Sequence, residues 1–124
     1  MKIRLSLIAS ALLLIGLTQT EFAYAVQGHL TTTIDKTLVS VPQTYGGCMA
    51  KLAAALSTAV PAVNCPGNFV SFSCNGTYVS KDLAFYMLDQ AQLALSLNKQ
   101  VFVVVDDTKK HNGNCFAQRI DVLK

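Results

Sequence analysis

Residues 80–100, SKDLAFYMLDQAQLALSLNKQ, decide the fold of this chain, because they form its one clear amphipathic helical pattern. Ser80 is a good N-cap, and Asp82 suits the positive end of a helix that we expect to stop at Asn98. At about 1.5 Å per residue, this helix is about 27 Å long. It leads directly into the apolar segment 101–105, so the pattern predicts a helix followed by a strand.

The apolar surface of this helix is wider than one sheet can cover. At about 100° per residue, the main apolar stripe contains Leu83, Ala84, Met87, Leu88, Ala91, Ala94 and Leu95. Three further residues extend that stripe to one side, namely Tyr86, Leu93 and Leu97. Because a helix on a single sheet needs a stripe of only about 100°, we expect another copy of the chain to cover this extension. The alternative is a monomer whose helix is simply rich in Leu and Ala.

The beginning of the chain has the pattern of a secretory signal peptide. Lys2 and Arg4 precede the apolar run 5–17, and residues 23–25 spell an A-x-A cleavage site. The apolar run is shorter than the roughly 20 residues that span a membrane, which disfavours an anchor. The pattern therefore predicts a bacterial periplasmic or secreted protein with no membrane span after cleavage.

The cysteines predict a disulfide framework. All four follow the predicted signal peptide, at Cys48, Cys65, Cys74 and Cys115. An even number of cysteines in an exported domain indicates two disulfides, whereas a four-cysteine metal site usually contains close C-x-x-C pairs, which this chain lacks. Three connectivities are possible. If residues 48–52 pair antiparallel with residues 70–74, Cys48 lies beside Cys74, which favours the pairs Cys48–Cys74 and Cys65–Cys115.

Strand-like patterns predict five strands, at residues 28–41 (segments 28–34 and 36–41 taken together), 48–52, 68–74, 101–110 and 114–123. The segment 48–52 is also compatible with the start of a helix, and we interpret residues 53–63 as a loop with one helical turn at most. The strongest hairpin signal is Asn112-Gly113, which suits a type I′ turn between the last two strands. In that register Asp106 faces Arg119.

The order of these elements predicts the fold class. A helix between the third and fourth strands of a five-stranded set is the pattern of the OB-fold. We therefore expect residues 1–25 to be a signal peptide and residues 26–124 to form one mainly β domain, a five-stranded OB-fold-like barrel with one α-helix. Closure of a barrel suits so short a chain, because it removes exposed strand edges.

Several motifs carry a resemblance to a known family. Cys48 begins one predicted strand, Cys74 ends the next, Leu88-Asp89-Gln90-Ala91 lies in the helix, and Asn98-Lys99-Gln100 leads into the following strand. In this order and spacing the chain resembles the OB-fold B subunits of AB5 toxins, of the subtilase cytotoxin and typhoid toxin type, and related small exported bacterial proteins. The resemblance implies a ring pentamer, with helices around a central pore and outer faces that bind cell-surface glycans. The chain departs from the family in having no Trp.

Catalysis, metal binding, cofactors and nucleic acid are not expected. The candidate acid–base group is Asp106, Asp107, His111, Asn112 and Asp121. Pairing of Asp106 with Arg119, and the turn at residues 111–113, explain most of this group without a site. The glycines form neither a dinucleotide-binding nor a phosphate-loop pattern. A net charge of +3, with no basic cluster larger than Lys109-Lys110, does not favour nucleic acid.

Two tyrosines beside turns are the candidate ligand contacts. Tyr45 and Tyr78 place a ring that can stack on a sugar, and a hydroxyl that can form hydrogen bonds, at predicted loop positions. We therefore expect an exported, non-catalytic binding module that binds a glycan and self-associates as toxin B subunits do. The alternative is a monomeric periplasmic protein that binds or inhibits another exported protein through a sheet edge.

Overall fold

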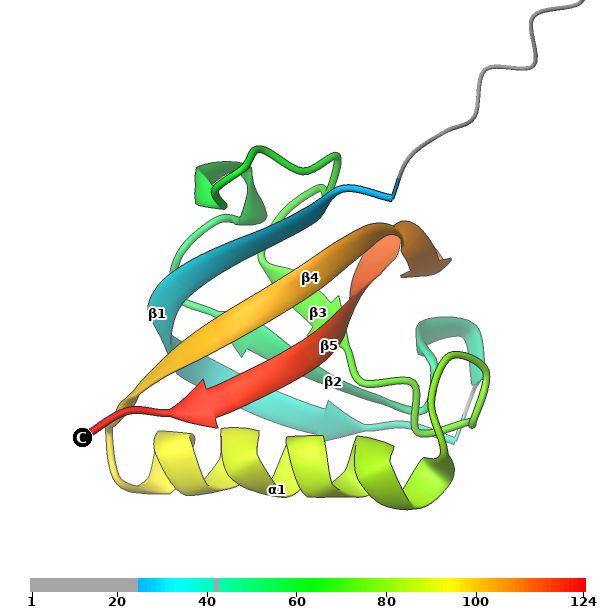
Figure 1. Ribbon diagram of the computed structural model, residues 1–124. Helices are drawn as coiled ribbons and strands as arrows, with labels where there is room; N and C mark the ends of the chain where they lie inside the picture. The colour runs from blue at the N-terminus through cyan, green and yellow to red at the C-terminus, as the bar shows by residue number, and fades with distance from the viewer. Residues whose placement is uncertain (1–24, 42) are drawn as a thin grey trace, which may run out of the picture.

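The computed structural model describes residues 25–41 and 43–124 (Figure 1). Apart from Ala25, the predicted signal peptide lies outside the described residues. The elements are, in order, β1 (Gln27–Val39), the 3₁₀ turn η1 (Gln43–Tyr45), β2 (Cys48–Leu52), the 3₁₀ turn η2 (Leu56–Thr58), β3 (Phe69–Ser71), α1 (Lys81–Ser96), β4 (Gln100–His111) and β5 (Asn114–Val122). The strands close into a ring in the order β1-β2-β3-β5-β4. The fold is mainly β with one helix between β3 and β4, as the sequence predicts.

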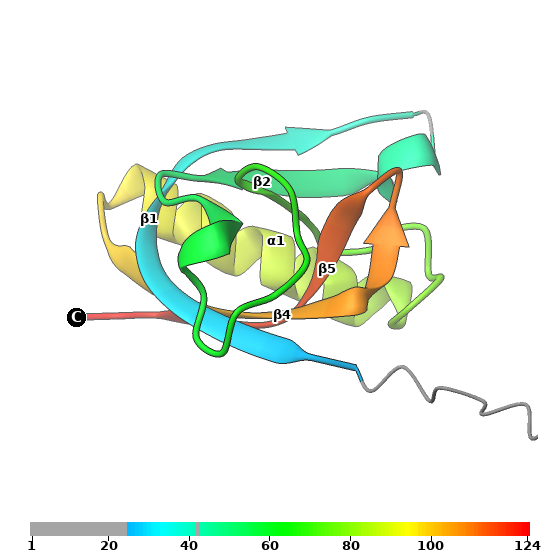
Figure 2. The ribbon, with the colours of Figure 1, turned by 90° about the horizontal axis from the view of Figure 1, so that it is seen from above.

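One long strand, β1, pairs with two different strands of the ring. The first half of β1 pairs with β4, and its second half pairs with β2. A register shift between Ile34 and Lys36 separates the two halves, which is the effect of a β-bulge at Asp35. Figure 2, seen from above, shows β1 curving round the ring as a result. The segments expected at 28–34 and 36–41 are therefore the two halves of one bent strand.

The helix lies across one end of the ring (Figure 1). Ser80 is its N-cap, as predicted, and the Ser80 hydroxyl accepts a hydrogen bond from the Leu83 amide at 3.4 Å. Regular helix ends at Ser96, and Asn98 takes a positive φ of 50°, which terminates it. The side chains that α1 buries against the strands are Ala84, Met87, Leu88, Ala91 and Ala94.

The β4–β5 hairpin keeps the predicted register only beside its turn. A shift between Asp106 and Lys110 places Asp106 opposite Phe116, so the predicted pairing of Asp106 with Arg119 is wrong. Arg119 lies opposite Val104 instead. Uniform counting from the turn fails because this shift adds residues 107–109 to β4, and a second shift, between Val104 and Val105, adds Gln118 to β5.

Both disulfides join the pairs that the sequence favours. Cys48–Cys74 and Cys65–Cys115 have Cα–Cα distances of 5.5 and 5.8 Å. The register used for the first pair is wrong by two residues, since Met49 lies opposite Ser71. Such a shift keeps the same residues on each face of the sheet. The segment after Leu52 contains only the short turn η2, and β2 is a strand rather than a helix.

Candidate functional site

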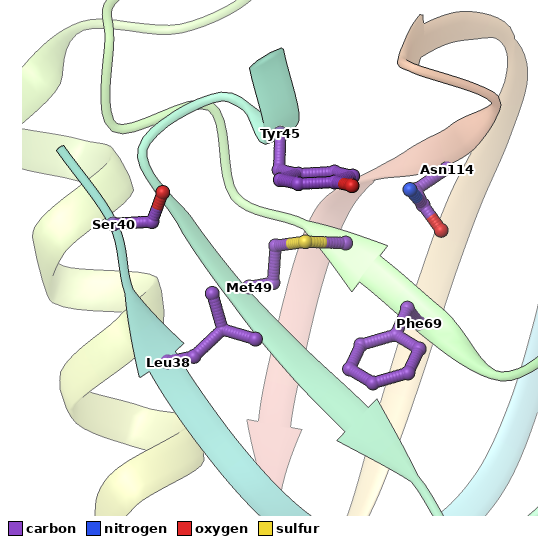
Figure 3. A pocket seen from close by; sticks show the side chains of 6 residues that line it. All are labelled: Leu38, Ser40, Tyr45, Met49, Phe69 and Asn114. Atoms are coloured by element: carbon purple, nitrogen blue, oxygen red, sulfur yellow. The ribbon is translucent and has the colours of Figure 1, made fainter. Parts of the chain in front are cut away.

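A pocket of about 360 Å³ lies on the outer side of β1, β2 and β3 (Figure 3). We call it the Tyr45 pocket, and its lining residues are Leu38, Ser40, Tyr45, Met49, Phe69 and Asn114. Leu38 is paired with Met49 across β1 and β2. Met49 is buried but does not belong to the core cluster inside the ring, so it forms the floor of an external pocket. The volume falls at the low end of small-molecule sites, about 300–1,000 Å³.

The ring of Tyr45 is held by a fixed backbone. The Ser71 hydroxyl donates a hydrogen bond to the Tyr45 carbonyl at 2.9 Å, and the Asn75 amide donates to the Gly46 carbonyl at 3.0 Å. The Tyr45 residue is 39% exposed, and its ring lies above the Met49 side chain in Figure 3. The structure thus places this predicted ligand residue in the wall of the pocket.

Two polar side chains lie at different sides of the pocket (Figure 3). Ser40 follows β1, and Asn114 is the first residue of β5. The Asn114 amide nitrogen donates to the His111 carbonyl at 3.3 Å, which orients the amide beside the Tyr45 and Phe69 rings. The pocket therefore combines an apolar floor with a hydroxyl and an amide from distant parts of the chain.

The other predicted ligand residue, Tyr78, is placed elsewhere. Its hydroxyl donates to the Lys110 carbonyl at 2.8 Å. Its ring packs against the rings of His111 and Phe116, with centroid distances of 4.8 and 5.7 Å. Both its polar and its apolar groups thus contact the chain itself, and Tyr78 does not line the Tyr45 pocket.

A buried serine–histidine contact lies behind η1. The Nε2 atom of His111 is 3.1 Å from the Ser73 hydroxyl oxygen. That oxygen accepts from the Tyr78 amide at 3.0 Å, and the hydroxyl donates to the Asn75 side-chain oxygen at 3.1 Å. Because the serine proton is used, His111 donates to Ser73 rather than accepting its proton. This arrangement is opposite to that of an activated nucleophile and fits a structural role.

Burial lowers the pKa of His111, because removal from water disfavours the charged ring. The unfolded chain therefore takes up the proton first as the pH falls below 6.5, and the free energy of unfolding decreases there. We expect a slope of at most about 1.4 kcal/mol per pH unit from this group, and full stability above pH 6.5. His111→Gln should flatten this slope in urea titrations between pH 5 and 7. Equal slopes in the two proteins would contradict the assignment.

The remaining candidate acid–base residues do not converge. The buried Asp106 carboxylate accepts from the Thr108 amide and hydroxyl at 2.9 and 2.6 Å, and Lys109 lies 3.3 Å away. Burial raises the pKa of Asp106, but these hydrogen bonds and the lysine outweigh it and hold the pKa below 3.8. Arg119 instead binds Asp121 through two contacts, at 3.0 and 2.6 Å.

Asp107 accepts hydrogen bonds from the amides of Val26 and Asn64, both at 3.1 Å, and Asn112 forms the turn with a φ of 49°. The candidate residues are thus used in separate local contacts. Among the residues that the structure describes, no group of three or more His, Cys, Asp or Glu side chains is placed to hold a metal ion.

One side of the helix exposes a row of large apolar side chains. We call it the helix flank, and its members and exposed fractions are Leu83 49%, Tyr86 65%, Leu93 46% and Leu97 57%. Leu83 and Leu95, which the sequence assigns to the main apolar stripe, are both exposed. Leu83 lies at the edge of the arc that α1 buries, and Leu95 lies in its last turn. With Gln90, the flank residues are spaced three and four apart, as core positions of a coiled coil are.

No protein-family model, curated protein or solved structure matched this chain. Within residues 25–41 and 43–124, none of the helical segments has the length and apolar character needed to cross a bilayer. The two disulfides indicate a non-reducing environment.

Proposed function

We propose that this protein is an exported, non-catalytic binding module that self-associates through the helix flank and binds glycans on its outer surface. The observation that carries this proposal is the exposure of four large apolar side chains in one row. A row of exposed large apolar side chains of this kind supports an interaction site on this side of the helix. The resemblance to AB5 toxin B subunits supports a second copy of the chain as the partner, in a ring in which the helices meet.

The spacing of the helix flank supports a helix as its partner. Residues three and four apart form a nearly straight seam along a helix, and such seams pack against each other by inserting side chains into holes on the facing helix. Full burial of a leucine stabilises by roughly 1.5–3 kcal/mol, so covering the exposed half contributes about 1 kcal/mol for each leucine. The contributions of several leucines in each of several subunits add up to a favourable free energy of association.

A charge in the helix flank should separate the subunits. Leu93→Lys places an ammonium group in the seam, and we expect association to weaken about 100-fold, corresponding to about 2.8 kcal/mol. The measurement is sedimentation velocity over a range of protein concentrations. Phe85→Lys is the matched control, because Phe85 is 45% exposed on another side of the same helix and Leu93 is 46% exposed.

The two variants separate the possible interfaces. Dissociation by Leu93→Lys alone supports the helix flank as the interface. Dissociation by Phe85→Lys alone, or by both variants equally, would contradict the assignment to this side of α1. A wild-type protein that is already monomeric would favour the alternative, a monomeric periplasmic protein that binds or inhibits another protein.

A further inference from the structure

We infer that the Tyr45 pocket binds the acetamido group and adjoining ring of an N-acetylated sugar, an assignment that rests on the proposed glycan-binding function. The pocket is a site on the outer side of β1, β2 and β3, separate from the helix flank on α1. The inference applies equally to a free N-acetylhexosamine and to the same sugar at the end of a glycan, since both present the same groups.

The apolar floor selects for a methyl group. Leu38, Met49 and Phe69 present carbon and sulfur surfaces, and the Met49 side chain is already buried. A sugar hydroxyl placed on this floor loses its hydrogen bonds to water, which costs free energy. The methyl of an acetamido group loses none and gains apolar burial, so the floor favours N-acetylated sugars over sugars that carry only hydroxyls.

The polar lining residues match the amide of the same group. The Asn114 side chain presents its carbonyl oxygen to the pocket, since its NH₂ group donates to the His111 and Asn112 carbonyls at 3.3 and 3.4 Å. The Ser40 side chain lies at a different side of the apolar floor (Figure 3). An acetamido group has one N–H, which can donate to the Asn114 carbonyl oxygen. All six lining residues are uncharged, which fits a neutral amide better than a phosphate or sulfate.

The tyrosine supplies the contact to the sugar ring. The Tyr45 ring forms one wall above Met49, and its hydroxyl points towards the Asn114 side of the pocket (Figure 3). An aromatic ring offers a flat apolar face to the C–H groups of a sugar and a polar edge to its hydroxyls. Because the hydrogen bonds of Ser71 and Asn75 already fix the η1 backbone, little ordering is needed on binding.

The test uses saturation-transfer difference NMR on the exported, disulfide-bonded protein, with four sugars as probes. N-acetylglucosamine and N-acetylgalactosamine should give strong signals with the largest saturation on the acetyl methyl. Glucose and galactose should bind at least 10-fold more weakly, since the apolar floor then lacks its methyl group. Equal signals from the N-acetylated and hydroxyl-only sugars would overturn the inference.

Variants locate the binding site. Tyr45→Ala should reduce N-acetylglucosamine binding at least 10-fold, and Tyr45→Phe should retain more of it because the ring stays. Phe85→Ala removes an aromatic ring that is 45% exposed on another side of α1, outside both the pocket and the helix flank, and it should leave sugar binding unchanged. Circular dichroism melting curves identify any variant that fails to fold. If Tyr45→Ala fails to fold, Tyr45→Phe, which keeps the ring, is the variant that tests the site. Equal binding by wild type and Tyr45→Ala would overturn the inference.

A glycan array separates this inference from the proposed function. Binding restricted to glycans with an accessible N-acetylated residue, and lost in Tyr45→Ala, supports both. Binding of other glycans that Tyr45→Ala retains overturns the assignment of this pocket and leaves the glycan-binding function standing. An array with no binding, together with no signal from the four sugars, overturns both.

Discussion

Replacing Cys65 and Cys115 together with alanine should lower the free energy of unfolding by about 4 kcal/mol. This disulfide joins residues 50 apart in sequence, the loop after η2 and the start of β5. The cross-link removes much of the freedom of the unfolded chain, and the loss grows with the length of the closed loop. Since small domains are stable by only about 5–15 kcal/mol, the variant should be close to unfolding at 37 °C.

The second disulfide provides the comparison for this effect. Cys48 and Cys74 are 26 residues apart, and their joint replacement with alanine should cost about 3.5 kcal/mol, slightly less than the other pair. Urea unfolding of the oxidised wild type and of both double variants gives the two values. A Cys65/Cys115 variant that unfolds at the wild-type urea concentration would contradict the assigned framework.

Gly46→Ala should destabilise the protein by about 2–5 kcal/mol, the sum of a backbone and a packing contribution. Gly46 has a φ of 79°, which costs an alanine roughly 1–2 kcal/mol. A Cβ atom there would lie 2.5 Å from the Ser71 hydroxyl oxygen and 2.6 Å from the His111 ring, which adds about 1–3 kcal/mol of overpacking. The loop that carries Tyr45 would shift as a result.

Gly113→Ala is the matched control for this substitution. Gly113 has a φ of 82°, and no atom lies within 4 Å of the position that a Cβ would take. Gly113→Ala should therefore lower the free energy of unfolding only by the cost of the backbone conformation, about 1–2 kcal/mol. Thermal unfolding of both variants measures the difference, with roughly 4–8 °C expected for each kcal/mol. Equal losses in the two variants would contradict the tight contact of Gly46 with Ser71 and His111.

Much of the fold could be predicted from short stretches of the sequence. The N-cap Ser80 and the apolar periodicity located α1, and Asn112-Gly113 located the hairpin turn, because each depends on neighbouring residues only. The even cysteine count and the alternation of strand residues led to both disulfides. The position of one helix between the third and fourth strands then indicated the architecture.

The bulges could not be predicted, because their positions depend on how strands far apart in the sequence pair with each other. Asp106 leaves the predicted register in a segment where its carboxylate binds the backbone and hydroxyl of Thr108. The bulge at Asp35 lies where β1 changes from pairing with β4 to pairing with β2. Neither pairing partner can be read from the residues next to the bulge.

The Tyr45 pocket was only partly predictable. Tyr45 stood out as an aromatic residue beside a turn, and Asn114 follows the Asn112-Gly113 turn. Met49 and Phe69 gave no signal, since an apolar residue in a strand is usually assigned to the core. Their outward direction depends on which face of each strand the closed ring buries, and this is a property of the whole fold.

The most direct test of self-association is the molar mass of the disulfide-bonded wild-type protein, measured by light scattering across a concentration series. Exposure of the helix flank predicts a mass several times that of one chain, which decreases towards the monomer on dilution. A monomer mass at every concentration up to about 1 mM, where an association free energy of only about −4 kcal/mol is still detected, would contradict it.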